Sequence, residues 1–522
     1  MTPNLAPAFD EALEKAEREL EQICLDEIHD LGISKTHADL LGSHTVVTYP
    51  PLDSLREVDG NLLFKELRFQ PEVDTYMHIP FCEYPCKFCP YTTLSISGRD
   101  GEQMPGYMDV LKIEIATWGR KLREQNTKVR SLYVGGGTPF AILAEQLEDI
   151  MTFVRTTLPF AENPEICVET SPHATLQDDA QRKLEILRKY GTTRMSIGIQ
   201  SFDMESLKDM ARTFRGHTQN DEERAVKFLL ESRIPNINID MIQDLPLQSK
   251  DYLERLKDDL FKVVELKPQH VTWYNLRLRP ETAYARHDVK LVTEKQSLHT
   301  RLTIWNFMEA VGYVVLEGDR FALAQSYEDK FRQTRGSVDT DLLGMGVSAY
   351  SHLHPGFFHN PREIGSTVRA DSQRAVQKYI QKVMENGHAI TYGFPLTDDE
   401  LLAGKFALGL KRGVPLEEIH EFLSVSPECG PYNNMILRPS TKLIESGLLE
   451  VTDGKVRFTR IGRLFENEIC ATFYSPRVRY LAHERRGTIT EEIRQNYQNY
   501  RVAQELNLTR SEQPSILSMG VL

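Results

Sequence analysis

The chain has 522 residues, of which 40% are hydrophobic and 26% charged, and its formal net charge is −13. This length is too great for one ordinary hydrophobic core, so two or three structural units are expected. The negative charge argues against a nucleic-acid partner, which usually requires a basic face. No apolar run approaches the roughly 20 residues of a membrane span, and the acidic start MTPNLAPAFDEALEKAEREL has no signal-peptide pattern. The sequence therefore predicts a soluble, cytoplasmic, globular protein.

Residues 1–70 are predicted to form an N-terminal helical extension that ends in a Pro-containing connector around residues 49–51. From Thr75 onward, short β-rich runs alternate with helical patterns. The runs are TYMHI (75–79), SLYVGGG (131–137), EICVETS (165–171), RMSIGIQS (194–201), INIDMI (237–242) and HVTWYNL (270–276). Strands that alternate with helices indicate parallel βα units. Six such units predict an α/β fold, a partial (β/α)6 barrel over residues 71–365, rather than a closed eight-fold barrel.

Residues 366–480 read as a smaller C-terminal domain. Helical patterns there are followed by a hairpin that turns at Asp453-Gly454, an order typical of a winged helix. Its many glutamates disfavour nucleic-acid binding: Glu417, Glu418, Glu421, Glu445 and Glu450. We expect this domain to cover the barrel mouth or to shape a substrate site. Residues 481–522 are predicted to be a polar, helical or partly ordered tail.

The strongest chemical signal is HIPFCEYPCKFCPY, which holds Cys82, Cys86 and Cys89. Three thiolates at this spacing can bind three corners of a cubane 4Fe-4S cluster and leave one iron open. Zinc is the alternative, but it normally takes a fourth protein ligand, and His78 would be awkwardly placed for that role. The other cysteines, at positions 24, 167, 429 and 470, are predicted to be small buried hydrophobes.

Polar and glycine residues fall where the predicted strands end, which is where catalytic groups collect in such barrels. They are Gly135–Thr138, Glu169, Gln200 with Ser201, Arg212 shortly afterwards, and Asp240 within the fifth strand. Each also has a structural interpretation, because a tight βα turn needs glycine and a strand-end carboxylate can be a solvated charge. The run DTDLLGMGVSAYS (339–351) is equally consistent with close packing of a last barrel strand. Their convergence favours one shared site.

Together these motifs resemble a known family. HIPFC-xxx-C-x-FC, GGGTP, the acidic third-strand end, SIGIQSF, NIDMIQDLP and DLLGMGVSAYS are similar, in the same order, to the oxygen-independent coproporphyrinogen III oxidase family of radical S-adenosylmethionine (SAM) enzymes. The similarity runs from about Tyr49 to about Phe473. It implies a partial barrel, a 4Fe-4S cluster held by Cys82, Cys86 and Cys89, and two SAM molecules bound close together.

The resemblance also assigns SAM contacts. Tyr76, Gly136, Glu169, Asn275 and Tyr350 match positions that hold the cluster-bound SAM, although Asn275 requires a one-residue shift in the alignment. Phe88, Gly137, Thr138, Gln200, Arg212 and Asp240 match positions around the second SAM.

One departure decides how the function is interpreted. The family's oxidases continue the loop with a further cysteine two residues after the third ligand, and here that residue is Tyr91. The related class C radical SAM methyltransferases, including a menaquinone methyltransferase type, lack this cysteine. The leading hypothesis is therefore methyl transfer from SAM to an sp2 carbon of an aromatic or quinone-like small molecule. The alternatives are oxidative decarboxylation of coproporphyrinogen, in which Arg215, Arg277 and Arg279 would help to bind carboxylates, and a heme chaperone.

Each enzyme reading carries implications for partners. A one-electron donor such as flavodoxin or ferredoxin is expected to reduce the cluster. A quinone substrate would also require contact with the surface of a membrane.

Overall fold

The computed structural model describes residues 5–42, 46–84, 86–214, 216–246, 251–287, 289–327, 330–331, 340–353, 356–363, 366–417 and 438–510. Within these residues, thirteen strands form one sheet in the order β1-β15-β14-β13-β12-β2-β5-β6-β7-β8-β9-β11-β10. The strands are β1 (Arg56–Glu57), β2 (Glu72–Ile79), β5 (Lys128–Gly136), β6 (Phe160–Thr170), β7 (Arg194–Gln200), β8 (Asn236–Gln243), β9 (His270–Asn275), β10 (Val314–Glu317), β11 (Arg320–Ala322), β12 (Asp341–Met345), β13 (Tyr350–Leu353), β14 (Gly356–His359) and β15 (Tyr392–Pro395).

The parallel part of this sheet is the partial barrel that the sequence predicts. All six predicted runs are strands, β2 and β5 to β9, and each pairs in parallel with its neighbour. β12 adds a seventh parallel strand on the other side of β2, with Gly344 opposite Tyr76. The run at 339–351 therefore does provide a last barrel strand, although Asp339 lies outside the described residues.

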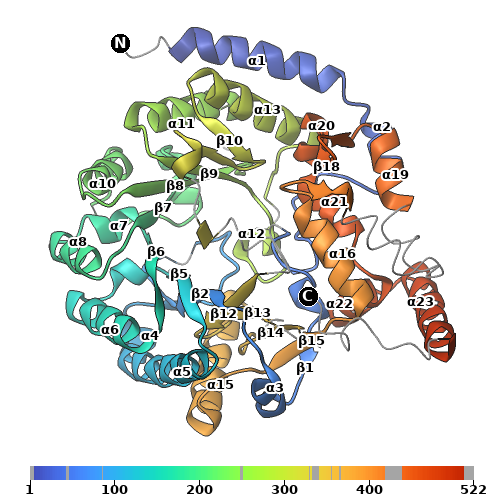
Figure 1. The fold of residues 1–522 in the computed structure, drawn as a ribbon. Helices are drawn as coiled ribbons and strands as arrows, with labels where there is room; N and C mark the ends of the chain where they lie inside the picture. The colour runs from blue at the N-terminus through green and yellow to red at the C-terminus, as the bar shows by residue number, and fades with distance from the viewer. Residues whose placement is uncertain are drawn as a thin grey trace.

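Helices cover the outside of the curved sheet (Figure 1). The longer ones are α5 (Met104–Glu124), α6 (Ala144–Thr157), α8 (Ala180–Lys189), α10 (Asp221–Leu230), α11 (Tyr252–Leu266) and α13 (Glu294–Ala310), and α4 (Gly98–Glu102) and α7 (Pro172–Thr175) are shorter. Two further short helices are α9 (Met204–Asp209) and α12 (Ala283–Arg286), and α12 lies near the centre of the ring instead of outside it (Figure 1). Helix α13 starts with a capping box in which Thr293 and Gln296 satisfy each other's backbone N–H groups.

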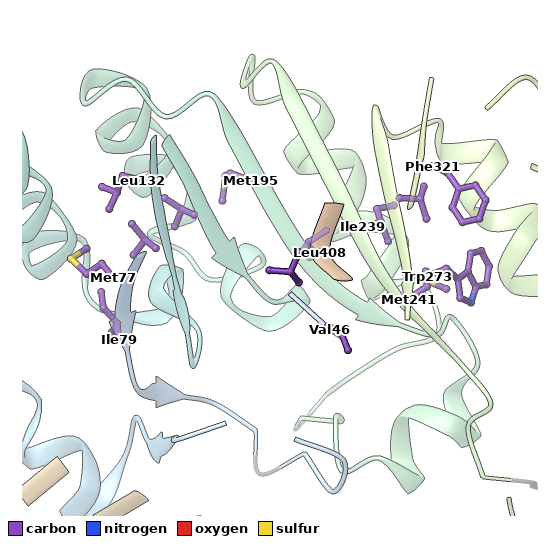
Figure 2. Close-up of a cluster of buried hydrophobic side chains, with 14 of the residues drawn as sticks. Val46, Met77, Ile79, Leu132, Met195, Ile239, Met241, Trp273, Phe321 and Leu408 are labelled. Carbon is purple, nitrogen blue, oxygen red and sulfur yellow. The ribbon is translucent and has the colours of Figure 1, made fainter. Parts of the chain in front are cut away.

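Alternation along the strands separates the core from the barrel interior. Met77 and Ile79 of β2, Leu132 of β5, Met195 of β7 and Met241 of β8 belong to the buried apolar cluster (Figure 2). Because successive side chains of a strand point to opposite faces, the residues between them face inward. Those inward residues are polar, among them Tyr76, His78, Ser196 and Asp240. The same alternation that builds the core therefore lines the barrel with hydrogen-bonding groups.

The N-terminal residues pack onto the barrel. Helix α1 (Leu5–Glu21) runs along α13 (Figure 1), and Phe9 makes edge contacts with Phe261 of α11 and Phe307 of α13, each at 6.1 Å between ring centres. Helices α2 (Leu25–Asp30) and α3 (Gly60–Glu66) follow before β2. Cys24, which precedes α2, is exposed, so the expectation that it is buried was wrong; Cys167 and Cys470 are buried, and Cys429 lies outside the described residues.

Most C-terminal elements lie in the gap between the two ends of the sheet, β10 and β1, whereas α15 (Val368–Asn386) lies outside the sheet beside α5 (Figure 1). The others include α16 (Asp398–Gly409), α19 (Arg438–Glu445), α20 (Arg460–Leu464), α21 (Glu466–Thr472), α22 (Pro476–Arg486) and α23 (Glu491–Arg510). β16 (Val414–Pro415), β17 (Leu449–Thr452) and β18 (Lys455–Phe458) form a small antiparallel sheet. Its hairpin turns at Asp453-Gly454, as expected, with φ angles of 52° and 70°.

The division of the chain at residues 70, 365 and 480 stays a proposal, since β15, which lies beyond residue 365, belongs to the main sheet. Glu418 and Glu421 of the proposed C-terminal domain, and residues 511–522 of the tail, lie outside the described residues. Within the described part of the chain, no helix is long and apolar enough to cross a membrane.

The contact between α1 and the barrel can be tested with Phe9→Ala. Removing a buried ring leaves a cavity between α1, α11 and α13, and such truncations cost about 3 kcal/mol or more. Urea unfolding should show a loss of this size, while Lys15→Ala, at an exposed position of the same helix, should change stability by less than about 0.5 kcal/mol. Equal stability of both variants would mean that α1 is not held by this contact.

Candidate active site in the barrel mouth

The three cysteines and the eleven residues that the resemblance assigns to SAM line one cavity of about 400 Å³ at the barrel mouth, whereas Gly135 and Ser201, which the strand-end pattern also singled out, are not part of its lining. The set comprises Cys82, Cys86, Cys89, Tyr76, Phe88, Gly136, Gly137, Thr138, Glu169, Gln200, Arg212, Asp240, Asn275 and Tyr350. They come from β2, the loop after it, the ends of β5 to β9, and the start of β13. Parallel strands bring their carboxyl ends to one edge, so residues far apart in the sequence meet here.

The loop that carries the cysteines is fixed at both ends. β3 (Phe81–Cys82) pairs with β4 (Leu94–Ser95), and this pairing joins the beginning of the loop to its end. At the far side, the Lys87 N–H donates to the Met210 carbonyl at 3.1 Å, and the Tyr284 N–H donates to the Lys87 carbonyl at 3.0 Å. The residues between the cysteines are therefore anchored to the barrel rim.

The surroundings of the three cysteines disfavour free thiolates. Burial of the Cys82 thiol, together with the neighbouring Cys86, raises the pKa of Cys82 to about 11. Burial also raises the pKa of Cys89 well above its ordinary value. The Cys82 thiol and the Thr138 hydroxyl are 3.3 Å apart, and the Arg212 guanidinium donates to the sulfur of Cys86 at 3.4 Å. Three neighbouring thiolates repel one another. All three can be ionised at once only if a positively charged group lies between them.

The donor set fits an iron–sulfur cluster. Its ligands are soft thiols, and three of them leave one iron without a protein ligand. In the described part of the chain, no three His, Cys, Asp or Glu side chains are gathered as ligands of a single metal ion. His78, the suggested fourth zinc ligand, contacts the Thr92 carbonyl through Nε2 at 2.9 Å and the Tyr76 hydroxyl through Nδ1 at 3.1 Å.

The glycine turn after β5 is packed so closely that side chains are excluded. A Cβ atom on Gly135 would lie 2.8 Å from the Glu169 carboxylate, and one on Gly136 would lie 2.7 Å from the His78 ring. Gly136 also has a φ of 116°, which L side chains rarely adopt. The exposed backbone of this turn forms a cradle that suits the polar end of a small ligand such as SAM.

Glu169 is held beside this cradle. Its Oε1 accepts from the Tyr133 hydroxyl at 2.9 Å, and its Oε2 accepts from the Gly136 N–H at 3.1 Å. Two donors fix the carboxylate in one orientation at the cavity wall. A carboxylate in this place can receive hydrogen bonds from an ammonium or a ribose hydroxyl of SAM.

A second group of predicted residues gathers around β7 and β8. Gln200 has a φ of 72°, and Arg212 donates to the Gly198 carbonyl at 2.5 Å. Asp240 accepts from the Ser196 hydroxyl and the Asn238 amide, both at 2.8 Å. Burial raises the pKa of Asp240, while these two hydrogen bonds act in the opposite direction.

Asn275 is held on both sides of its amide. Its nitrogen donates to Asp244 at 3.1 Å, and its oxygen accepts from Arg301 at 2.8 Å. Sequence reasoning missed Asp244, which follows β8, and Arg301 of helix α13. No local sequence pattern shows that either side chain reaches the end of β9. Tyr350 stacks on Phe357 of β14 at 5.4 Å between ring centres.

Basic side chains predominate among the described residues that line the cavity. Nine are cationic, namely Lys35, Arg194, Arg212, Arg277, Arg279, Arg301, Arg320, Arg362 and Arg463, and four are carboxylates, namely Glu169, Asp240, Asp319 and Glu466. Four of these arginines have carboxylate partners within 4.0 Å: Arg277 with Glu468, Arg279 with Asp39 and Glu281, Arg320 with Glu317 and Asp319, and Arg362 with Asp53 and Glu281. Among the side chains that line the cavity itself, cations outnumber carboxylates, in a chain whose net charge is −13. The sequence indicated only part of this, through Arg277 and Arg279, and Arg215 lies outside the described residues.

The cavity roof comes from both ends of the chain. Lys35, Val47, Thr48 and Leu52 line it from the N-terminal segment, and residues 463, 464, 466 and 467 line it from α20 and α21. The Lys35 ammonium donates to the Leu464 carbonyl at 2.5 Å, which joins the two parts. These contacts follow from tertiary packing and have no sequence motif.

This barrel with its cysteine loop and glycine turn is that of a radical SAM enzyme, and the model of the radical SAM superfamily matches residues 76–260. The oxygen-independent coproporphyrinogen III oxidase of Salmonella typhimurium is 29% identical over 419 residues, covering 76% of this chain and 84% of that protein. The heme chaperone HemW of Escherichia coli is 30% identical over 292 residues, covering 54% of this chain and 71% of that protein.

A solved structure of coproporphyrinogen III oxidase (HemN) from Escherichia coli superposes with a TM-score of 0.67 at 26% sequence identity, covering 82% of this chain and 96% of that chain. The chain belongs to the HemN and HemW (oxygen-independent coproporphyrinogen III oxidase-like) family of radical SAM proteins. The family implies a 4Fe-4S cluster and SAM. The comparisons show this family and not the methyltransferase subgroup that the sequence favoured.

The role of Glu169 predicts the behaviour of Glu169→Gln. The amide presents an N–H₂ group to either Tyr133 or Gly136, both of which are donors, so one hydrogen bond is lost and the wall rearranges. The dissociation constant for SAM, measured by anaerobic calorimetry, should rise about ten-fold or more, while the iron content stays at the wild-type level. Unchanged SAM affinity would remove Glu169 from the SAM site.

Asp259 of α11 predicts a pH dependence of stability. It accepts from the Phe202 N–H at 2.7 Å and the Ser201 hydroxyl at 2.9 Å, which anchors the chain just after Gln200. Burial raises its pKa to about 7, above the ordinary value near 3.9. The folded state therefore holds a proton that the unfolded state releases, and this contribution to stability is lost as the pH rises from about 4 to about 7.

Asp259→Asn cannot ionise and keeps an acceptor for Phe202. Thermal melts at pH 5, 6, 7 and 8 should show a flatter stability profile for the variant than for the wild type. Parallel profiles would contradict this account of Asp259.

Proposed function

We propose that this radical SAM enzyme oxidises a small molecule that carries several carboxylates, in the manner of the oxygen-independent coproporphyrinogen III oxidases to which it is similar. The observation that carries the proposal is the basic lining of the cavity, where nine cationic side chains accompany four carboxylates. Arginine binds carboxylates with two parallel hydrogen bonds and keeps its charge when buried. Such a wall offsets the cost of bringing an anion into an acidic protein.

The chain's own residues have positioning roles in this reaction. Cys82, Cys86 and Cys89 would hold the cluster, and the turn at Gly135–Gly137 with Glu169 would hold SAM beside it. When bound, SAM and the reduced cluster supply a 5′-deoxyadenosyl radical. The cavity and its roof would exclude water and hold the substrate's propionate side chain close to the 5′ carbon of the adenosyl group.

The proposed oxidation balances as follows. A hydrogen atom leaves the substrate side chain and gives 5′-deoxyadenosine, the adjacent carboxylate leaves as carbon dioxide, and one electron passes to a one-electron acceptor. The product is a vinyl group. One electron enters with SAM cleavage from a donor such as flavodoxin or ferredoxin and one electron leaves, so the external electrons cancel and SAM, which ends as methionine and 5′-deoxyadenosine, is the two-electron oxidant of the side chain.

Methyl transfer to an sp2 carbon is the second candidate, and Tyr91 favours it. This residue lies at the cavity in an exposed position, where the oxidases that the sequence resembles have a cysteine. A phenol is less acidic than a thiol and is not a soft, sulfur-type nucleophile or iron ligand, so Tyr91 cannot do the chemistry that a cysteine thiolate does at that position. The residues around Gln200, Arg212 and Asp240 would then hold a second SAM as the methyl source, and the substrate would be aromatic or quinone-like.

The products of one anaerobic reaction separate the candidates. Reconstituted protein is incubated with dithionite, an electron acceptor, methyl-labelled SAM and either coproporphyrinogen III or a menaquinone precursor. The proposal predicts carbon dioxide and 5′-deoxyadenosine without S-adenosylhomocysteine. Formation of S-adenosylhomocysteine together with 5′-deoxyadenosine would replace it with methyl transfer, and stable heme binding without SAM consumption would indicate a chaperone.

Two sets of variants sharpen this assay. Cys86→Ala should abolish both the brown cluster absorbance and SAM cleavage. Tyr91→Cys should raise the rate of carbon dioxide release, with Tyr91→Phe as the matched control that removes only the hydroxyl. Equal rates for the wild type, Tyr91→Cys and Tyr91→Phe would show that position 91 does not determine the reaction.

A further inference from the structure

Ser348, in the turn between β12 and β13, has a strained backbone at the cavity. Its φ is 56°, in the left-handed region that residues other than glycine adopt rarely and at a cost. It also lines the cavity beside Thr92. Strain of this kind persists only where the surroundings enforce it, and it gathers at functional sites.

The Ser348 side chain is fully used in holding two segments together. Its hydroxyl donates to the Pro361 carbonyl at 3.1 Å, and its N–H donates to the same carbonyl at 3.0 Å. The Thr92 hydroxyl is 2.5 Å from the Ser348 hydroxyl. Because the only hydroxyl proton of Ser348 goes to Pro361, Thr92 must be the donor in this pair.

Thr92 lies three residues after Cys89, at the exit of the cysteine loop. Its carbonyl contacts Nε2 of His78 at 2.9 Å, and the next N–H, of Thr93, donates to Ser372 at 2.9 Å. Since a carbonyl can only accept, Nε2 of His78 carries the proton. Burial lowers the pKa of His78 to about 4, so the ring is neutral, and Nδ1 accepts from Tyr76. The loop exit is thus held by β2, by α15 and by the turn at Ser348.

The turn itself is anchored from behind by Glu114 of α5. The carboxylate accepts from the Gly346 N–H at 2.7 Å, from the Asn360 amide at 2.9 Å and from the Tyr379 hydroxyl at 2.7 Å. The Tyr107 hydroxyl accepts from the Val347 N–H at 3.1 Å and donates to the His78 carbonyl at 2.8 Å. Ser348 therefore stands on a rigid support, and the strained conformation points its hydroxyl at the loop.

We propose that Ser348 is a positioning residue that clamps the exit of the cysteine loop through Thr92, and so holds Cys89 in the pose in which it binds the cluster. The inference rests on the cluster-binding role of the triad under the proposed function, and it is independent of which reaction follows. The clamp makes the loop less free to open, which slows release of iron.

The test uses hydroxyl deletions at both ends of the clamp. Thr92→Val removes the hydroxyl at nearly constant shape, Thr92→Ser keeps it, and Ser348→Ala removes the other hydroxyl. Ser351→Ala, three residues further on in β13, is the control, because the Ser351 hydroxyl accepts from the Gly344 N–H instead of contacting Thr92. After anaerobic reconstitution, the rate of iron loss to a chelator and the cluster's midpoint potential are measured without substrate.

Thr92→Val should lose iron about five-fold faster than the wild type, as expected for one lost hydrogen bond, and Ser348→Ala, which also loses the bond to Pro361, should lose it at least as fast. The double variant should lose iron no faster than Ser348→Ala, and Thr92→Ser and Ser351→Ala should behave like the wild type. Equal rates for Thr92→Val and Thr92→Ser, or additive effects in the double variant, would overturn the proposal. If Ser348→Ala does not fold, the comparison of Thr92→Val with Thr92→Ser decides the test. The rate of iron loss is measured without substrate, so it can be interpreted even if the decarboxylation assay fails.

Discussion

The site is built outward from one close contact, between the glycine turn after β5 and the backbone that leads into the cysteine loop. The Gly137 N–H donates to the Ile79 carbonyl at 2.9 Å, and the Thr138 N–H donates to the Phe81 carbonyl at 2.7 Å. A Cβ on Gly137 would lie 2.3 Å from that same Phe81 oxygen. Only glycine allows the approach, so this residue sets the distance between the cysteines and the SAM cradle. Thr138, the next residue, reaches the Cys82 sulfur as a consequence.

Much of this arrangement is predictable because it is encoded locally. Strand alternation with helices predicts the partial barrel, and the carboxyl ends of parallel strands must meet at one edge. The three cysteines and the GGGTP turn have spacings that identify their chemistry without any knowledge of the fold. The three cysteines and the residues that the resemblance assigns to SAM line one cavity, although the assignment of each to a particular SAM molecule stays a prediction.

The rest of the site depends on contacts between distant segments. Arg301 reaches Asn275 from helix α13, and Lys35 reaches Leu464 across more than 400 residues of sequence. The turn at Ser348 meets Thr92 only because β12 pairs with β2. None of these side chains lies in a pattern whose period or spacing reveals its partner. Cys24 shows that residue type alone can also mislead. A cysteine outside any motif was expected to be buried, and it is exposed.

The chemistry shared by the superfamily and the specificity of this chain's reaction depend on different parts of the sequence. The radical SAM match covers residues 76–260, which include the triad, the glycine turn, Glu169, Gln200, Arg212 and Asp240. Most of the basic lining lies outside that range, from Lys35 to Arg463. The shared segment therefore carries the residues expected to bind the cluster and SAM, whereas most cationic side chains of the cavity, to which we attribute substrate selection, lie in the roof and the later strands. Relatives with this fold carry names as different as oxidase and chaperone, and a fold alone does not decide between them. In this chain the arginines favour a carboxylated substrate, and Tyr91 is the one residue of the cysteine loop that argues against the oxidase chemistry.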